Sequence, residues 1–190
     1  MNSFFNKIKT LITDKSLRMR VLFVVFGLFL FRLLAAIPVP GVDPARINQF
    51  LNGNQFFGVF NALSGGGLSR FSIVMLGIGP YITASIIMQL LSMMVPRIKE
   101  LMQESGEAGR KKFNQYVRLL TVPLAVLQSF SFIKYLQSQN AIDALSMQAL
   151  IVNIIIITGG SMLLLWIGEL INEFGIGNGT SLIIMAGILA

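Results

Sequence analysis

The sequence predicts an all-α protein, a bundle of helices that crosses a membrane several times. Of its 190 residues, 54% are hydrophobic and only 12% are charged, and the mean hydropathy is +0.74. Charged residues make up about 25% of an ordinary soluble domain. Several apolar runs also approach the roughly 20 residues that a helix needs to cross a bilayer. Together these observations exclude an ordinary soluble domain.

The first two predicted spans are separated by a mixed loop. Residues 1–20 are basic and place their apolar side chains at helical spacing, which predicts an amphipathic helix at the membrane surface. The first span is predicted over 21–37, because Pro38 follows its apolar run. The second span is predicted over 71–95 and is stopped by Pro96.

A charged loop is predicted over 96–118, and the remaining spans follow it. The third span is predicted over 119–136, the fourth over 148–170, and the start of a fifth over 180–190. A helix of that last length covers only about half of a bilayer at about 1.5 Å per residue. We therefore expect 1–190 to be a fragment of a longer protein, or its last helix to be completed elsewhere.

Basic residues predict the orientation. Most of the 15 Lys and Arg residues lie in 1–20 and 96–118, which face the same side if the spans alternate. Loops rich in Lys and Arg remain in the cytoplasm, so the N-terminus is predicted to be cytoplasmic. The basic excess is then a topology signal, and we expect no direct binding of nucleic acid.

The chain lacks the residues that most enzyme mechanisms need. It contains neither His nor Cys, so it offers no serine–histidine pair and no thiol chemistry. An intramembrane aspartyl protease needs paired carboxylates, and Asp14, Asp43 and Asp143 lie outside the predicted spans. The small residues at 159–161 are interpreted as a place of close helix packing. We expect no enzyme, no cofactor and no metal site.

Two other polar features interrupt the apolar pattern. Arg32 lies inside the first predicted span, where a charge is a candidate for function, but it lies close enough to Pro38 to snorkel outward or bind a backbone carbonyl. The run GIGNG at 175–179 lacks the Lys-Ser/Thr ending of a phosphate-binding loop. We interpret it as a turn, with Asn178 or Thr180 capping the next helix.

The second predicted span is unusual because glycine and polar residues interrupt it. The glycines at 65–67 predict a break between a half-polar leader, 60–64, and the span itself. Ile78 and Ile82 are four residues apart and share one helical face. A pore gated by apolar side chains and ordinary helix packing both explain this pattern, and the spacing leaves both open.

Four stretches carry a family resemblance. They read FRLLAAIPVPG, LSGGGLSRFSIVMLGIGPYITASIIMQLL, ESGEAGRKKFNQY and LLWIGELINEFGIGNGTSLIIMAGI. In this order and at this spacing they resemble the N-terminal half of bacterial SecY, the channel subunit of the general secretion (Sec) translocon. A full member of that family has ten spans in two halves related by inverted pseudo-symmetry. The resemblance implies that this chain supplies spans one to four and the start of the fifth.

The resemblance also implies roles for the interrupted span. In the family, a short helix ahead of the glycines is a plug that seals the resting channel, which places the plug here over about 60–70 with the glycines as its hinge. The next helix forms one side of a lateral gate through which signal sequences and membrane spans pass into lipid. Thr83 and Gln128 match polar positions of that gate. The plug and hinge residues are Asn61, Leu63, Ser64, Gly65, Gly66, Gly67 and Arg70.

A ring of apolar side chains constricts the pore in this family. Ile78, Ile82 and Ile184 match three of its positions. Thr180 stands where the family often has another isoleucine, which leaves its part in the ring open.

The function implied is the central subunit of a protein-conducting channel in the bacterial cytoplasmic membrane. Its expected partners are SecE-like and SecG-like small membrane subunits, the SecA motor ATPase, the ribosome, signal sequences, nascent chains and membrane lipid. The motor and the ribosome contact mainly the C-terminal half, so we expect the 190-residue chain alone to conduct nothing. The alternatives are a small-molecule or ion transporter and, less favoured, an intramembrane protease.

Overall fold

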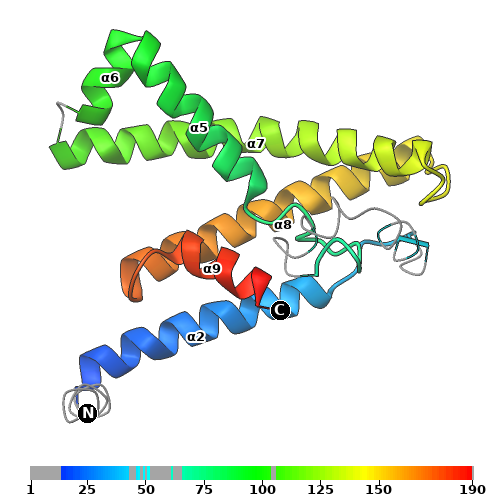
Figure 1. Cartoon of the computed structure of the whole chain (residues 1–190), viewed down its shortest axis with the longest axis horizontal. Coiled ribbons are helices and arrows are strands. Elements are labelled where there is room, and N and C mark those ends of the chain that lie inside the picture. Colours follow the sequence, from blue (N-terminus) through cyan, green and yellow to red (C-terminus); the bar gives the residue numbers. More distant parts are fainter. Residues whose placement is uncertain are drawn as a thin grey trace.

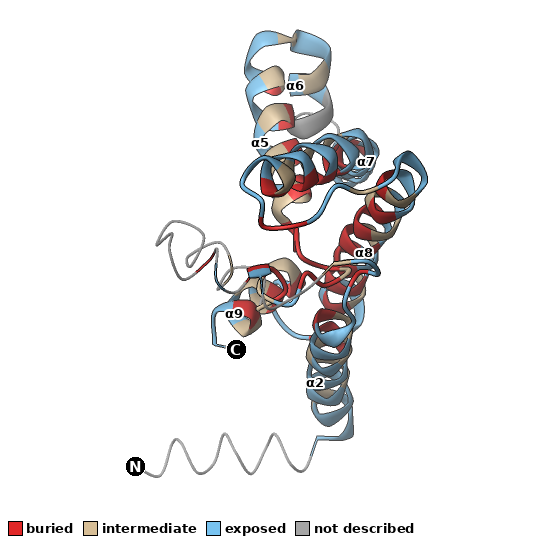
Figure 2. Cartoon of the chain, turned by 90° about the vertical axis from the view of Figure 1, so that its right-hand side faces the viewer, coloured by how far each residue is buried: buried red, intermediate tan, exposed pale blue. Residues whose placement is uncertain are grey.

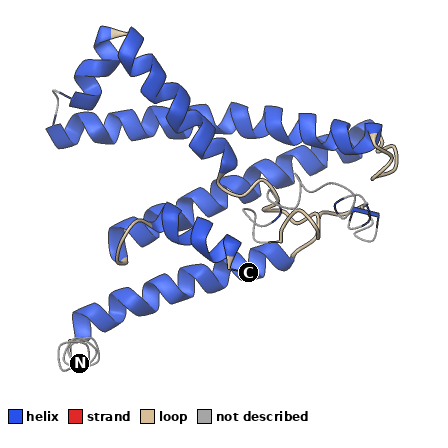
Figure 3. Cartoon of the chain, viewed as in Figure 1, coloured by secondary structure: helices blue, strands red, loops and turns tan. Residues whose placement is uncertain are grey.

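The computed structural model describes residues 14–42, 46, 47, 49, 51, 61, 66–103 and 106–189, with no side-chain description for 101–103. In this part of the chain the regular elements are helices joined by loops, with no strand (Figure 3). The prediction of an all-α fold is therefore confirmed. The helices are α2 (Lys15–Ala36), α5 (Gly79–Met94), α6 (Pro96–Gln103), α7 (Gly106–Ser138), α8 (Met147–Phe174) and α9 (Gly179–Ile188).

Three of the described helices are long and apolar enough to cross a membrane. These are α2 with 22 residues, α7 with 33 and α8 with 28, while α5 and α9 are shorter apolar helices. The lengths and composition of these helices thus agree with the bundle of several membrane-spanning helices that was predicted from composition.

Helix α2 begins earlier than predicted. Asp14 caps it, because its Oδ1 accepts a hydrogen bond of 3.0 Å from the backbone N–H of Ser16. That bond also holds the pKa of the Asp14 carboxyl below its ordinary value. Residues 15–20, assigned from sequence to a separate surface helix over 1–20, therefore continue the first span as one helix. Residues 1–13 of that surface helix lie outside the described residues.

The second span is helical only from Gly79, although its helix was predicted from Phe71. Residues 71–78 form tight turns, and Phe71 and Gly77 have φ angles of 46° and 56°. This left-handed backbone cannot continue a right-handed helix. Met75 N–H donates to the carbonyl of Ser72, three residues back, at 3.0 Å. The predicted span over 71–95 is therefore a stretch of turns followed by a helix.

The predicted loop over 96–118 is largely helical. Helix α6 occupies its first part, and α7 begins at Gly106 and continues without interruption into the third span predicted over 119–136. Phe113 and Val117, in the supposed loop, are buried against Ala84 and Met88 of α5. Apolar burial thus extends the helix into sequence that its charge made look like a loop.

The later elements lie close to their predicted positions. Helix α8 begins at Met147 and ends at Phe174, a few residues beyond the fourth span predicted over 148–170. Helix α9 begins at Gly179, one residue before the predicted fifth span over 180–190. Asn178 caps α9, because its Oδ1 accepts a hydrogen bond from Ser181 N–H at 3.2 Å. Of the two proposed caps, Asn178 is the one that the geometry supports.

Helix α8 is the element around which the others pack. It lies between α7 on one side and α2 and α9 on the other (Figure 1). The buried residues of the described part gather along one face of α7 and of α8 and in the turns that lead to α5, whereas much of α2 and the outer faces of the other helices are exposed (Figure 2). Those exposed apolar faces are typical of helices that contact lipid or other membrane helices.

Glycines let the chain approach α8 closely. A methyl group added at Gly160 would lie 2.0 Å from the carbonyl oxygen of Ile73, and one at Gly179 would lie 2.1 Å from that of Gly168. The interpretation of 159–161 as a packing site is confirmed for Gly160 and for Ser161, which is also buried. Gly159 instead faces open space.

We expect Gly160→Ala to lower the free energy of unfolding by about 1–3 kcal/mol, because overpacking forces the backbone at Ile73 to move. Gly159→Ala is the matched control and should be neutral or stabilising by up to about 1 kcal/mol, since alanine favours a helix. Reversible unfolding in denaturing detergent measures both. Equal effects of the two substitutions would contradict the packing assigned to Gly160.

Candidate functional site

The turns that lead to α5 are covered by protein. Val39 N–H donates to the carbonyl of Phe71 at 2.8 Å, and Ile73 N–H donates to that of Ile37 at 3.0 Å. Ser72, between them, is fully buried. Irregular backbone at membrane depth is tolerated only where protein buries it or where it lines a water-filled cavity. The segment that follows α2 and the face of α8 at Gly160 provide that cover.

Part of the predicted plug and hinge forms one compact turn. Asn61 Oδ1 accepts from Ser69 N–H at 2.8 Å, and the Asn61 carbonyl accepts from Gly66 N–H at 2.9 Å. Gly66 has a φ of 74°, the left-handed backbone that glycine adopts without strain. Gly67 is buried and Arg70 is exposed. Leu63, Ser64 and Gly65 lie outside the described residues.

The three predicted ring residues occupy different environments. Ile78 is only 5% exposed, in a cluster formed by α2, α8 and α9, and Ile184 packs against the same cluster. Ile82 lies one turn further along α5 and is 42% exposed. The structure thus brings Ile78 and Ile184 together and leaves Ile82 facing outward. Thr180 is half-buried, and its hydroxyl donates to Asn178 Oδ1 at 2.6 Å.

The two predicted gate residues are in contact. Gln128 Nε2 of α7 donates to Thr83 Oγ1 of α5 at 3.3 Å, and Thr83 Oγ1 in turn donates to the carbonyl of Gly79 at 3.1 Å. An open, mostly apolar groove of about 610 Å³ runs beside this contact. The groove is lined by Leu76, Gly79, Thr83, Leu127, Gln128, Ser131, Phe132 and Tyr135.

The arrangement suits a largely apolar ligand. Apolar grooves with a few placed polar groups bind largely apolar ligands and fix their orientation through those groups. In the groove, the Thr83–Gln128 contact supplies such groups at the junction of α5 and α7. No cluster of His, Cys, Asp and Glu suited to a metal ion occurs among the residues that the structure describes.

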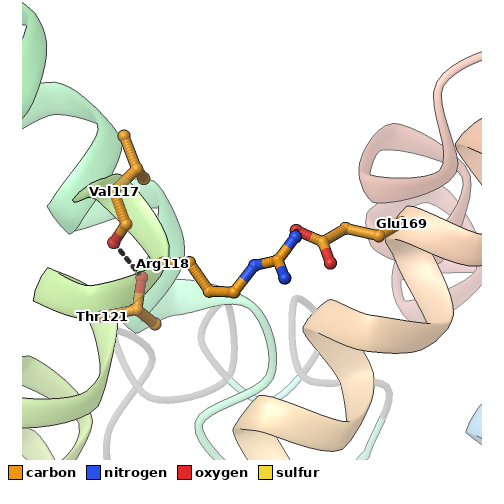
Figure 4. A network of polar contacts seen from close by, with 4 residues as sticks. All are labelled: Val117, Arg118, Thr121 and Glu169. Carbon is orange, nitrogen blue, oxygen red and sulfur yellow. Dashed lines mark hydrogen bonds and ion pairs between the residues drawn. The ribbon is translucent and has the colours of Figure 1, made fainter. Parts of the chain in front are cut away.

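Two polar contacts between α8 and its neighbouring helices were not predicted from the sequence. Asn172 Oδ1 accepts from Gly179 N–H at 2.6 Å and so ties the end of α8 to the start of α9. Arg118 of α7 and Glu169 of α8 form an ion pair, with Nη2 and Oε1 2.6 Å apart (Figure 4). Asn172 and Gly179 lie 7 residues apart in the sequence, and Arg118 and Glu169 lie 51 residues apart. In the sequence, the only sign of the ion pair was that each residue is an isolated charge near the end of a predicted span.

The described helices thus form a bundle around α8 in which one span is interrupted by protein-covered turns, an arrangement that membrane channels and transporters tolerate where the irregular backbone is buried. The SecY family profile matches residues 72–190. Protein translocase subunit SecY of Borreliella burgdorferi is 43% identical over 184 residues, which are 95% of this chain and 42% of that protein. The SecY of Buchnera aphidicola is 43% identical over 180 residues, 92% of this chain and 41% of that protein.

A solved structure of a SecY protein, described by the role of its plug domain in the closed channel, has the same fold. Its TM-score is 0.66 at 26% identity, and the match covers 89% of this chain and 35% of that chain. The chain belongs to the SecY family and is therefore a membrane protein. It spans about two fifths of the length of the curated relatives that it matches.

We expect Thr83→Val and Gln128→Leu to show a coupling free energy of about 0.6 kcal/mol, and no more than about 1.7 kcal/mol, as for other hydrogen bonds between membrane helices. A double-mutant cycle on the free energy of unfolding measures it. Thr83→Val combined with Ser138→Ala, at the exposed far end of α7, is the control and should be additive. A coupling of zero in the first cycle would show that the contact is not formed in the membrane.

Asn172→Ala should speed hydrogen exchange at the Gly179 amide and lower stability by about 1 kcal/mol, because that amide loses its acceptor. The exposed neighbour Glu173→Ala is the control and should leave this exchange rate unchanged. Unaltered exchange in Asn172→Ala would mean that the turn is held by its backbone alone.

Proposed function

We propose that this chain forms the N-terminal part of the central subunit of a protein-conducting channel, which moves secretory proteins across a membrane and membrane proteins laterally into it. The observation that carries the proposal is the Thr83–Gln128 contact beside an apolar groove, on a span interrupted by turns. Membership of the SecY family supports it, because the curated relatives are named protein translocase subunits. One structural neighbour, 25% identical with a TM-score of 0.64, is described as a protein-conducting channel.

The proposed mechanism uses apolar side chains as the seal. Ile78, Ile82 and Ile184 would close around a translocating chain without binding any one sequence, because apolar side chains hold no fixed water and limit ion leak. Residues 60–70 would form the plug of the resting channel, with the glycines as its hinge. In this proposal, α5 and α7 are one side of the lateral gate, and their groove receives the apolar segment that leaves for the lipid.

The location and partners belong to the same proposal. The excess of Lys and Arg in 1–20 and 96–118 supports a cytoplasmic N-terminus in a bacterial cytoplasmic membrane. SecE-like and SecG-like subunits, the SecA motor and the ribosome would assemble with the complete channel. No observation favours the transporter alternative, which would need an acidic residue or a histidine at the core of a span as its substrate site.

A photocrosslinking probe at Ile82 tests the function. In membranes that contain the complete channel, it should capture a stalled secretory chain only when that chain has an intact signal sequence. A probe at Ile155, which is exposed on α8, serves as the control and should not capture the chain. Capture at Ile82 that does not depend on the signal sequence, or no capture, would contradict the proposal.

A further inference from the structure

The described helices divide into two bodies. One consists of α5, α6 and the first half of α7, which share a core built around Ala84, Met88, Phe113 and Val117. We call this the α5–α7 body. The other consists of α2, the second half of α8, and α9, and its core is formed by Phe31, Ala35, Val74, Ile78, Leu164, Ile167, Ile171 and Ile183. We call this the α2–α8 body.

The two bodies are joined at one end. Ile133 and Leu136, near the end of α7, share a buried cluster with Leu150 and Ile157, near the start of α8. From this junction α7 and α8 diverge, and their other ends belong to different cores (Figure 1). The chain itself crosses between the bodies at Ile78, which is buried in the α2–α8 core just before α5 begins.

The ion pair of Arg118 and Glu169 connects α7 and α8 at the ends where the two helices diverge. Arg118 reaches from α7 across the space between the helices to Glu169 on α8 (Figure 4). The side chains are 48% and 28% exposed, so water screens the pair in part. Tyr81 of α5 adds a second link, because it packs against both cores. Because partly exposed ion pairs contribute little stability, this pair favours the arrangement in which the ends of α7 and α8 are held together without locking it.

We propose that the α5–α7 body swings relative to the α2–α8 body about the junction of α7 and α8, and that the Arg118–Glu169 ion pair is the latch that holds the two together. Ile82 and Thr83 move with the first body and Ile184 with the second, so the latch sets their separation. The use of this motion as a gate rests on the proposed function, whereas the motion itself does not.

Distances between paired spin labels test the latch in the complete channel, reconstituted in lipid nanodiscs after any Cys outside these 190 residues has been replaced. The sequence has no Cys, so an introduced pair is the only labelled pair. Labels at the exposed positions Gln115 and Glu173 report the latched ends of α7 and α8. Labels at Ser138 and Gln148, also exposed, report the junction.

Arg118→Glu and Glu169→Arg should each lengthen and broaden the distance at the latched ends and leave the junction distance unchanged. The double variant R118E/E169R should restore the original distance, because it restores the pair in reverse. Arg118→Gln should give a smaller shift in the same direction. The control Arg110→Glu makes the same charge change two turns earlier in α7 and should shift neither distance.

An unchanged distance at the latched ends in both single variants would overturn the proposal. It would also be overturned if the double variant failed to restore the distance, or if both distances changed together, which would mean that the pair does not act at one end of a fixed junction. The readout needs no translocation. If the Ile82 probe captures no chain while the distances respond as expected, the proposed function fails and the latch stands.

Discussion

The fold depends on covering a stretch of backbone that is not helical. Residues 71–78 lie inside an apolar run, where unpaired N–H and C=O groups find no water. The chain meets this constraint by bonding both sides of Ser72 to the end of α2 and by laying Ile73 against Gly160 of α8. A side chain at position 160 would separate α8 from the turns and expose them. The central place of α8 in the bundle follows from this requirement.

The need to cover these turns also explains the positions of the predicted gate residues and of the predicted ring residues. The turns deliver α5 away from α8, so that Thr83 meets Gln128 of α7 while Ile78 stays in the core with Ile184 near it. Ile78 is the N-cap of α5, and its carbonyl accepts a hydrogen bond from Ile82 N–H at 3.1 Å. The two residues therefore lie one helical turn apart, yet Ile78 is buried where the chain leaves the α2–α8 core and Ile82 is exposed.

Sequence patterns predicted the fold class, the end of α2 and the positions of α8 and α9 well, because long apolar runs, Pro38 after α2 and Asn178 before α9 are local signals. They failed at 15–20 and 96–118, where charge suggested surface or loop. There the helices continue because Asp14 caps α2 and because Phe113 and Val117 are buried against α5. Thr83 and Gln128 were singled out by the family resemblance, and the structure shows that they are in contact. The Arg118–Glu169 pair joins residues 51 positions apart and depends on how α7 and α8 are placed relative to each other, which no local sequence pattern shows.

The length of α7 has a mechanical consequence. Its 33 residues extend for about 50 Å at 1.5 Å per residue, whereas the hydrocarbon core of a bilayer is about 30 Å thick. A straight crossing leaves the first part of α7 beyond the hydrocarbon, where α6 packs against it. The buried contact with α8 lies near the opposite end of the helix. A force applied to the first part of α7 therefore acts far from that contact and exerts a large torque on it.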